Sequence, residues 1–376
     1  MVEWKKLGEI SNRNKGIPIT AGQMSELATP NGNVRVFAAG QTIADINEAD
    51  LPTNCAHKQP SVIVKSRGYI DFEFYEKPFT HKNEMWSYSF EDKETGRFVY
   101  YYLTTKTDFF RKKAKANSVK LPQLCVADTD NYLIPIPSLE EQTRIVGILD
   151  TFTSAIENLK EQIAQRRKQY EYYRDQLLDL EGKPGVEMKT LGEVGEFIRG
   201  AGILKSDFVD EGFPCIHYGQ IHTRYGISAT KAISHIDESL YKKSKKAVKG
   251  DVILATTSED AEGCAKPVAW LGEEEVAVSG DAYIYHHNQN GKFMAYQFMT
   301  HNFMLFKIMN ATGAKVVRIS GDNMAKYEFP LPPLSEQQRI VSILDAFEAS
   351  IQNLEAQLSQ REKQYEYYRN KLLTFE

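Results

Sequence analysis

The sequence lacks the long apolar runs and the cysteine clusters that mark membrane, secreted and zinc-binding proteins. No stretch approaches the roughly 18 uncharged apolar residues that a membrane span needs, and the opening residues contain no apolar secretion segment. We therefore expect a cytoplasmic protein. The cysteines are scattered, without a CxxC pair or zinc-ligand spacing, and are expected to be buried free thiols: Cys55, Cys125, Cys215 and Cys264.

A marked positive charge is also missing. The 376 residues have a formal net charge of -4, which argues against binding nucleic acid through overall charge. Residues 1–134 nevertheless carry 18 Lys and Arg against 16 Asp and Glu, so such binding would have to use local basic patches. Hydrophobic residues make up 42% and charged residues 26%, which is typical of a chain folded throughout, and the length favours two or three cores.

The motifs of nucleotide-using enzymes are absent too. A methyltransferase needs a glycine-rich loop and an Asn/Asp-Pro-Pro-aromatic motif, and the nearest string, at residues 331–334, has neither the polar nor the aromatic group. An ATP-driven translocase needs GxxxxGK(S/T), which residues 311–315 do not match. The acidic run at residues 273–275 is interpreted as surface charge, and His217 and His222 lack a third metal ligand. We therefore predict a non-catalytic chain without a metal site.

What the sequence does contain is an internal repeat. Residues 135–181 recur as residues 330–376 at a constant offset of 195, with 28 of 47 positions identical. The same offset reaches back to Gly96 and Gly291. Each half of the chain is therefore predicted to be a divergent globular domain followed by a nearly unchanged helix, which suggests one common scaffold and two different ligands.

Both copies of the repeated segment have the pattern of a long amphipathic helix. Apolar and aromatic residues recur at every third and fourth position from Ile145 and from Ile340, which makes an a/d heptad seam. Two such seams can bury each other, and some 43 residues at about 1.5 Å each would make a rod of roughly 60–65 Å. Ser138 and Ser335, each followed three residues later by Glu or Gln, resemble capping boxes at the two helix starts.

Polar residues on these helices allow more than one interpretation. Arg166 and Arg361 occupy matching seam positions, either as a register device or with the stem packed and the guanidinium in solvent. Tyr172 and Tyr367 point away from the seam and are predicted to contact a partner protein. The neighbouring tyrosines fit the seam and are expected to pack in its core: Tyr170, Tyr173, Tyr365 and Tyr368.

The globular halves alternate short β-rich runs with loops rich in Gly, Asn, Lys and aromatic residues. The predicted fold class is therefore α+β, with two globular domains separated by two long antiparallel helices that form a coiled coil in a pseudo-twofold internal repeat. The predicted boundaries are residues 1–134 and 185–329 for the globular domains, and 135–184 and 330–376 for the helical spacers.

The repeated motifs resemble a known family. Leu139 and Leu334 each begin an L-x-E-Q-x-R-I-V-x-I-L-D sequence after a Pro-x-Pro loop, and both copies end in Q-Y-E-Y-Y-R. With two divergent domains, this pattern resembles the specificity (S) subunit of type I restriction-modification systems over essentially the whole chain.

The resemblance implies a function in DNA recognition. Each globular half would be a target-recognition domain that reads one half of a bipartite sequence in double-stranded DNA, and the helices would set the spacing. Two methyltransferase (modification) subunits, which bind S-adenosylmethionine and methylate adenine, would dock on the helices. The complex could also be joined by restriction subunits, which would cut DNA with ATP and Mg. The chain itself would hold no cofactor.

Side chains with the hydrogen-bond groups that bases and phosphates require lie in loops beside the predicted strands. Lys120 and Lys315 align at the offset of 195, so both are expected to contact phosphates. The Gly-Gln pairs ending at Gln41 and Gln220 occupy comparable places, as reading elements or as turns. The residues predicted to contact DNA are Arg35, Gln41, Lys65, Arg67, Lys82, Asn83 and Lys120 in the first domain, and His217, Tyr218, Gln220, His222, Arg224, Thr257, Ser258, Lys315 and Arg318 in the second.

A scaffold protein with two protein-binding domains on a helical hairpin is the alternative. It predicts no salt-dependent affinity for DNA, whereas a DNA reader binds weakly by itself and loses affinity steeply as salt rises. The lysine-rich run at residues 242–246 fits a contact with the DNA backbone and an exposed helix face nearly equally well.

Overall fold

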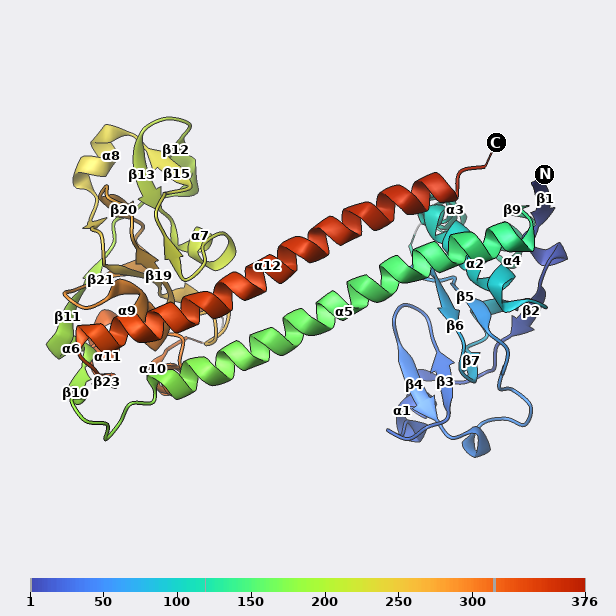
Figure 1. Ribbon diagram of the computed structural model, residues 1–376, viewed down its shortest axis with the longest axis horizontal. Helices are drawn as coiled ribbons and strands as arrows, with labels where there is room; N and C mark the ends of the chain where they lie inside the picture. Colours follow the sequence, from blue (N-terminus) through green and yellow to red (C-terminus); the bar gives the residue numbers. More distant parts are fainter. Residues whose placement is uncertain (1, 119, 314–315, 376) are drawn as a thin grey trace. The chain divides into compact units, whose positions relative to one another are not determined.

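The computed structural model describes residues 2–118, 120–313 and 316–375 (Figure 1). Contacts divide the chain into a first unit, Met1–Lys160 with Ala356–Glu376, and a second unit, Glu161–Glu355. Each unit contains strands and helices, so the predicted α+β class is confirmed. The division by contacts cuts through both long helices, whereas the predicted domain boundaries follow the helix ends, and those boundaries stay a prediction.

The first unit is built around short strands that pair over long sequence distances. β5 (Ser61–Lys65) lies at the centre because Val62, Ile63 and Val64 are β-branched and buried. The other strands are β1 (Glu3–Lys6), β2 (Asn12–Lys15), β3 (Val34–Phe37), β4 (Ile43–Ile46), β6 (Asp71–Tyr75), β7 (Phe79–His81), β8 (Trp86–Ser89) and β9 (Leu133–Ile136). They form sheets in the orders β2-β8-β5-β6, β4-β3-β7 and β1-β9, with β3 and β7 parallel.

One helix joins the sheets of the first unit to the long helices. Phe98 of α2 (Lys93–Thr105) shares a buried core with Val62 of β5 and with Ile145, the first seam residue. The Asp92 carboxylate accepts a hydrogen bond from the Thr95 N–H (3.2 Å) and caps the start of α2. The other helices of this unit are α1 (Ala21–Leu27), η1 (Leu7–Glu9), η2 (Glu48–Asp50), α3 (Thr107–Asn117) and α4 (Val126–Asp130).

The second unit repeats this plan with more strands. Its sheets have the orders β11-β21-β17-β19-β14 and β12-β15-β13-β20-β16, with the pairs β18-β22 and β10-β23. The strands are β10 (Glu187–Thr190), β11 (Gly195–Arg199), β12 (Phe208–Val209), β13 (Phe213–Ile216), β14 (Ser228–Ala229), β15 (Ser234–Ile236), β16 (Lys246–Ala247), β17 (Val252–Ala255), β18 (Thr257–Ser258), β19 (Lys266–Trp270), β20 (Val276–Val278), β21 (Ala282–His287), β22 (Val317–Arg318) and β23 (Glu328–Leu331).

The helices of the second unit are arranged like those of the first unit. Phe293 of α9 (Gly291–Gln297) shares a core with Val252 of β17 and Ile340, as Phe98 does with Val62 and Ile145. This equivalence confirms the internal repeat. The other helices are η3 (Lys205–Asp207), α6 (Leu191–Val194), α7 (Tyr218–Thr223), α8 (Glu238–Lys243), α10 (His301–Asn310) and α11 (Gly321–Met324).

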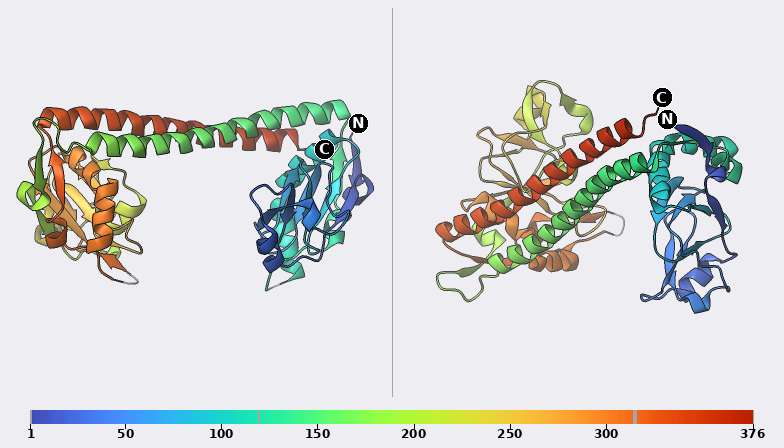
Figure 2. Two further views of the ribbon diagram at one scale, coloured as in Figure 1. Left: turned by 90° about the horizontal axis from the view of Figure 1, so that it is seen from below. Right: turned by 45° about the vertical axis from the view of Figure 1, so that its right-hand side comes forward.

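The repeated segments form two long helices, α5 (Leu139–Leu178) and α12 (Leu334–Leu372), each unbroken in both views of Figure 2. In the first unit, Phe152 of α5 stacks on Tyr368 of α12 with ring centroids 5.4 Å apart. In the second unit, Tyr173 of α5 stacks on Phe347 of α12 at 5.5 Å. Within each unit a second contact lies further along α5 and earlier on α12, or the reverse: Lys160 pairs with Glu362 in the first unit, and Arg167 pairs with Glu355 in the second. The two helices therefore pack antiparallel in both units, as predicted.

The starts of the long helices differ from one another. The Ser138 hydroxyl accepts a hydrogen bond from the Glu141 N–H (3.4 Å), as predicted for a cap. α12 begins at Leu334, so Ser335 lies inside the first turn and the predicted second capping box is wrong. Pro333 occupies the place of Ser138 in the repeat, and its carbonyl accepts the hydrogen bond of the Gln337 N–H (3.1 Å).

Two further expectations can be compared with the structure. Cys215 and Cys264 are buried, but Cys55 is half-buried and Cys125 is exposed, so the prediction of buried thiols is wrong for the last two. Cys125 immediately precedes α4 as its N-terminal cap residue. Among the described residues, no helix combines the length and apolarity that crossing a membrane requires.

Candidate nucleic-acid interface

In the first unit, four connections between strands and helices meet at one edge, which we call the first edge. The Lys82 N–H donates to the Phe37 carbonyl (2.9 Å), which joins the end of β7 to the end of β3. The Ser66 hydroxyl donates to the Glu84 carbonyl, and the Gly68 N–H donates to the Pro122 carbonyl (2.8 Å). The first edge therefore consists of the connections at residues 38–42, 66–70, 82–85 and 120–123.

Six of the seven residues predicted for the first domain lie on or beside the first edge. Lys65 ends β5 and pairs with Glu73 (2.7 Å), and Lys82 pairs with Glu84 (3.2 Å), so both ammonium groups are partly neutralised. The other four side chains are exposed and have no ion pair among the described residues: Gln41, Arg67, Asn83 and Lys120. The loops thus gather donors that the sequence places far apart.

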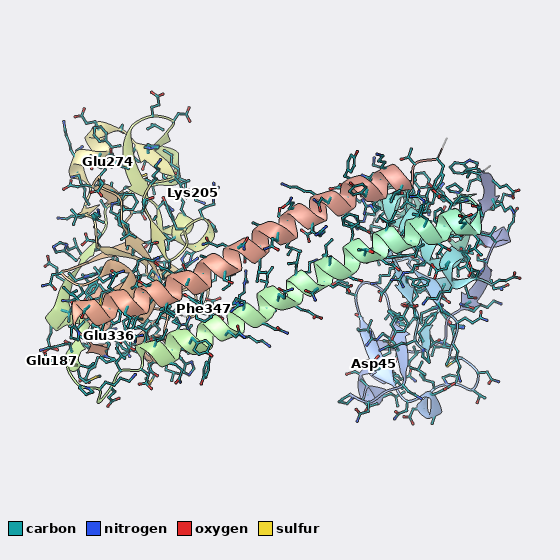
Figure 3. All side chains as sticks on the ribbon, in the orientation of Figure 1. Asp45, Glu187, Lys205, Glu274, Glu336 and Phe347 are labelled. Atoms are coloured by element: carbon teal, nitrogen blue, oxygen red, sulfur yellow. The ribbon has the colours of Figure 1, made fainter. Side chains whose placement is uncertain are left out.

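Arg35 is the exception, because it lies away from this edge. Its guanidinium donates two hydrogen bonds to the Asp45 carboxylate (2.8 and 2.9 Å; Asp45 is labelled in Figure 3) and lies 5.5 Å from the centre of the Tyr75 ring. These bonds raise the pKa of Arg35 and lower the pKa of Asp45. Tyr75 pairs with Ser61, at the end of β5 opposite to Lys65. A contact of Arg35 with DNA stays a prediction, but the described geometry gives this residue a role within the sheet.

The second unit has an equivalent edge, which we call the second edge. The Ser279 N–H donates to the Ile216 carbonyl (3.1 Å), and the Tyr218 N–H donates to the Ser279 hydroxyl (2.9 Å), so the ends of β20 and β13 meet at the start of α7. The His222 Nε2–H donates to the Thr257 carbonyl (3.0 Å) and joins α7 to β18.

Five predicted residues come together on the second edge. Thr257 and Ser258 of β18 pair with β22, in which Arg318 is exposed. Arg224 ends α7 and is exposed as well. Neither arginine has an ion pair among the described residues, and Lys315 lies outside them. The predicted residues that the structure joins here, through α7 and β18, are Tyr218, His222, Thr257, Ser258 and Arg318.

His217 and Gln220 have a different role, because they build the start of α7. His217 is only 6% exposed, and its Nδ1 accepts a hydrogen bond from the Gly219 N–H (3.1 Å). Gln220 accepts from the His217 N–H (3.2 Å) and donates to the Ser234 hydroxyl (2.6 Å). Burial lowers the pKa of His217, so its neutral form is favoured. The side chains are occupied by this cap, which the sequence does not reveal; their contact with DNA stays a prediction.

The two edges correspond to one another in the repeat. Arg67 forms an isolated bridge with Gln123, and Thr257 pairs with Arg318, which aligns with Gln123 at the offset of 195. In both units this pairing joins the connection that follows the central strand, β5 or β17, to the segment that precedes the last short helix, α4 or α11. The same edge is therefore kept in both units while its side chains differ.

Several residues of the second edge were not predicted. The Lys266 ammonium donates to the His222 carbonyl (3.1 Å), and burial lowers its pKa. Lys205, labelled in Figure 3, lies close enough to His217 to lower its pKa further. Asp281 accepts a hydrogen bond from the Thr257 hydroxyl (3.4 Å). Single lysines and aspartates in short strands and turns carry no sequence signal that separates them from ordinary surface residues.

The lysine-rich run begins in the last turn of α8, with Lys242 and Lys243, and continues into β16 at Lys246. Lys242 pairs with Glu238 within α8 (2.7 Å), and the Lys246 ammonium lies 4.9 Å from the centre of the Tyr241 ring. Within the described residues, no group of three His, Cys, Asp or Glu side chains is arranged to hold a metal ion. The site thus consists of hydrogen-bonding and basic side chains.

The long helices carry a second candidate surface in each unit. Tyr172 and Tyr367 are 61% and 60% exposed, in line with their predicted orientation away from the seam. The Arg166 guanidinium lies 6.0 Å from the centre of the Phe347 ring, and the Arg361 guanidinium lies 5.7 Å from that of Phe152 (Phe347 is labelled in Figure 3). These contacts favour packing of the arginines on the facing helix over a role in register alone.

The seam tyrosines are only partly buried. Tyr170 and Tyr365 are half-buried, whereas Tyr173 and Tyr368 remain exposed although their rings stack on the facing helix. The expectation of core packing is therefore wrong for the last two. Because α5 and α12 are only two helices, a ring at the border of the seam keeps one face in solvent.

Comparisons with known proteins identify the family to which the chain is similar. A family described as type I restriction modification DNA specificity domain matches residues 1–166 and 184–362. A type I restriction enzyme specificity subunit from Haemophilus influenzae is 28% identical over 401 residues, covering 100% of this chain and 96% of that protein. The specificity subunit of a type I restriction enzyme from Escherichia coli is 29% identical over 395 residues, covering 100% and 94%.

Solved structures share the fold. The S subunit of a type I restriction-modification system from M. genitalium superposes with a TM-score of 0.61 at 16% identity, covering 100% of this chain and 97% of that chain. A chain of a type I restriction-modification system gives a TM-score of 0.55 at 17% identity, covering 99% and 96%. With both halves matched by one family and the fold shared along the whole length, the chain belongs to the type I restriction-modification DNA specificity family.

Proposed function

We propose that the chain is the non-catalytic subunit that selects the DNA sequence for a type I restriction-modification complex, with each unit reading one half of a bipartite site in double-stranded DNA. The observation that supports this most directly is the pair of equivalent edges. Duplicated domains that present different side chains on the same edge are suited to reading different sequences.

The chemistry of the edges fits direct recognition of bases. Arg67 and Arg318 are exposed and unpaired among the described residues, and arginine can donate two hydrogen bonds to guanine in the major groove. Gln41 and Asn83 can pair in the same way with adenine. Lysines such as Lys120 are suited to phosphates, which position the protein without reading sequence.

The helices are proposed to set the gap between the half-sites and to dock two methyltransferase subunits. Ion pairs join the antiparallel helices within each unit, between Lys160 and Glu362 (3.4 Å) and between Arg167 and Glu355 (2.5 Å). Tyr172 and Tyr367 present the same exposed group at matching positions, which suits two copies of one partner. S-adenosylmethionine, and ATP and Mg where restriction subunits join, would bind to those partners in the cytoplasm.

Methylation in cells tests this function. The chain is expressed with its modification subunits in a host without adenine methylation at other sites, and the methylated adenines are sequenced. A bipartite sequence with a fixed gap is expected, and omission of the chain should abolish methylation. Methylation at one continuous sequence, or methylation that does not need the chain, would contradict the proposal.

Salt dependence separates the proposal from a protein-binding scaffold. Affinity of the complex for a duplex that carries the methylated sequence should fall linearly on a log–log plot against salt, with a slope of about -0.9 for each phosphate contact. A scaffold that binds proteins would show no such DNA affinity.

A further inference from the structure

Lys307 of α10 is a buried cation that the proposed function does not use. The residue is 3% exposed, and its ammonium donates to the Glu262 carbonyl (2.9 Å) and the Cys264 carbonyl (2.7 Å). The ammonium also lies 5.8 Å from the centre of the Phe303 ring. Burial lowers the pKa of Lys307, while the neighbouring carboxylates Glu262 and Asp260 favour its charged form.

Stability alone does not account for a lysine at this place. An ammonium loses its hydration when it is buried, and hydrogen bonds to two carbonyls recover only part of that loss. A methionine has a similar length and fills the same space without losing hydration of a charge. What Lys307 contributes is therefore the fixed position of its two acceptors, the carbonyls of Glu262 and Cys264.

The acceptors belong to the connection between β18 and β19, residues 259–265. The Cys264 thiol donates to the Thr256 carbonyl (3.3 Å), next to Thr257 of the second edge. A Cβ atom on Gly263 would overlap the Ser258 hydroxyl, so the connection folds back closely on β18. Ala265 follows with a φ of 55°, a left-handed conformation that a non-glycine residue keeps only when its surroundings hold it.

The repeat shows that this anchor belongs to one unit only. Lys112 aligns with Lys307 at the offset of 195, but it is exposed on α3. In the first unit the connection from the central strand β5 to β6 spans only residues 66–70, whereas in the second unit the connection from β17 to β19, which contains β18, spans residues 256–265. The longer connection of the second unit thus has a buried anchor that the shorter one lacks.

We propose that Lys307 is a positioning residue for the second edge: its buried ammonium fixes residues 259–265 against β18 and so places Thr257 and Ser258 for reading the second half-site. The effect on reading rests on the proposed function. The effect on the connection itself does not, because it follows from the two carbonyl contacts and the packing of Gly263 on Ser258.

Hydrogen exchange of the full chain tests the positioning step without DNA. Lys307→Met should raise amide exchange in residues 257–265 by roughly tenfold or more while the rest of the second unit and the melting temperature stay close to wild type. The matched control Lys112→Met should leave exchange unchanged in both units. Unchanged exchange at residues 257–265 in Lys307→Met would overturn the inference.

DNA discrimination tests the reading step in the complex with modification subunits. Binding is measured to a duplex that carries the methylated sequence and to duplexes with one base pair changed in either half. Lys307→Met should lower discrimination in the second half-site by about tenfold and leave the first half-site unchanged, because the loss in affinity for one mismatched base pair is of this order. Equal loss in both halves would overturn the proposal.

Lys307→Gln provides a second variant in case Lys307→Met does not fold. Its side chain is shorter and neutral and cannot hold both carbonyls as the ammonium does, so the same pattern of exchange and half-site discrimination is expected. A wild-type pattern in Lys307→Gln would contradict the positioning role. If the wild-type complex shows no sequence preference at all, the proposed function is refuted. The exchange data would still decide whether Lys307 positions the connection.

Discussion

At the scale of residues, the same kind of side chain has different roles according to its partners. Arg35 is held by two hydrogen bonds to Asp45, whereas Arg67 and Arg318 project from the edges without an ion pair among the described residues. Sequence alone identified all three as donors but not their partners, since Asp45 meets Arg35 only through the pairing of β3 with β4. The same limit applies to Gln220, whose amide is used inside a cap.

Removal of the free arginines should affect one half-site each. Arg67→Ala in the first unit and Arg318→Ala in the second should each weaken binding by about 1–3 kcal/mol and relax discrimination only in the half read by that unit, because a base contact is lost. Binding to duplexes changed in either half measures this.

Arg35→Ala tests whether this arginine acts only within the sheet. It should lower the free energy of unfolding by about 1 kcal/mol, because a partly exposed ion pair within a sheet is lost. A loss of discrimination in the first half-site would add the DNA contact that the sequence predicts for Arg35. An effect of Arg67→Ala on both half-sites would contradict the assignment of one unit to each half.

A buried histidine predicts how the first unit responds to acid. Burial lowers the pKa of His81 from 6.5 to about 4, and its Nε2 lies 3.2 Å from the Ser87 hydroxyl. In the unfolded chain His81 therefore takes up a proton near its ordinary pKa of 6.5, whereas in the folded chain it stays neutral until the pH approaches about 4. Stability is highest above that pKa and falls as the pH drops toward about 4, by up to ~3 kcal/mol for this group.

Urea unfolding measured across this pH range tests the prediction. In His81→Gln the part of the pH dependence that comes from His81 should disappear. The free energy of unfolding of the variant should therefore fall less than that of the wild type between neutral pH and pH 4. A pH dependence identical to that of the wild type would show that His81 does not resist protonation. His287 of the second unit, with a pKa also lowered to about 4, is expected to behave in the same way.

At the scale of elements, the sequence was most informative where a pattern is long and repeated. The heptad seam extends over many turns and occurs twice, so α5 and α12 could be predicted almost to their ends. The strands could not, because they are two to six residues long and pair with distant partners, as β3 does with β7. Short strands carry little periodicity, and long-range pairing depends on the whole domain.

Lengthening both long helices should change the gap between half-sites. Insertion of one heptad at facing positions in α5 and α12 keeps the seam in register and adds about 10 Å to each helix. At ~3.4 Å per base pair, the methylated sequence should gain roughly three base pairs between its halves. Sequencing of methylated adenines measures the gap.

Insertion in one helix alone serves as the control for this experiment. It shifts the seam of one helix against the other, so stacked pairs such as Phe152 with Tyr368 can no longer form together with the rest of the seam. A reduced melting temperature is expected. An unchanged gap in the double insertion would refute the idea that the helices measure distance.

At the scale of the whole molecule, the duplication explains which parts of the site could be foreseen. Residues that lie at the same place in both copies, such as Tyr172 and Tyr367, are exposed as predicted. Residues in the divergent domains needed the structure, because Lys307 and Lys112 align yet one is buried and the other exposed. In the helices, aligned residues of the two copies have the same surroundings, so one copy predicts the other. In the divergent domains, aligned residues no longer share their surroundings.

The matching tyrosines should bind matching partners. Tyr172→Ala and Tyr367→Ala should each remove one of two docking contacts, lowering the affinity for one methyltransferase subunit by about 1–3 kcal/mol, since exposed aromatics commonly dominate such interfaces. The melting temperature should not change, because both rings are mostly in solvent. Native mass spectrometry would detect complexes with one subunit in place of two.

Each single variant should leave one subunit bound, and the double variant should leave none at the same concentration. Retention of two subunits by the double variant would assign docking to another surface. Tyr170→Phe is a suitable control, because this half-buried residue loses only its hydrogen bond to Glu348 (3.3 Å).

The pairing of β1 with β9 and of β10 with β23 means that the entrance and exit of each globular domain are hydrogen-bonded to one another. A domain closed in this way is a cassette, whose contents can be exchanged without altering the ends that connect it to the helices. Under the proposed function, new sequence preferences could therefore arise by replacing one cassette at a time, while partners docked on the helices would meet an unchanged surface.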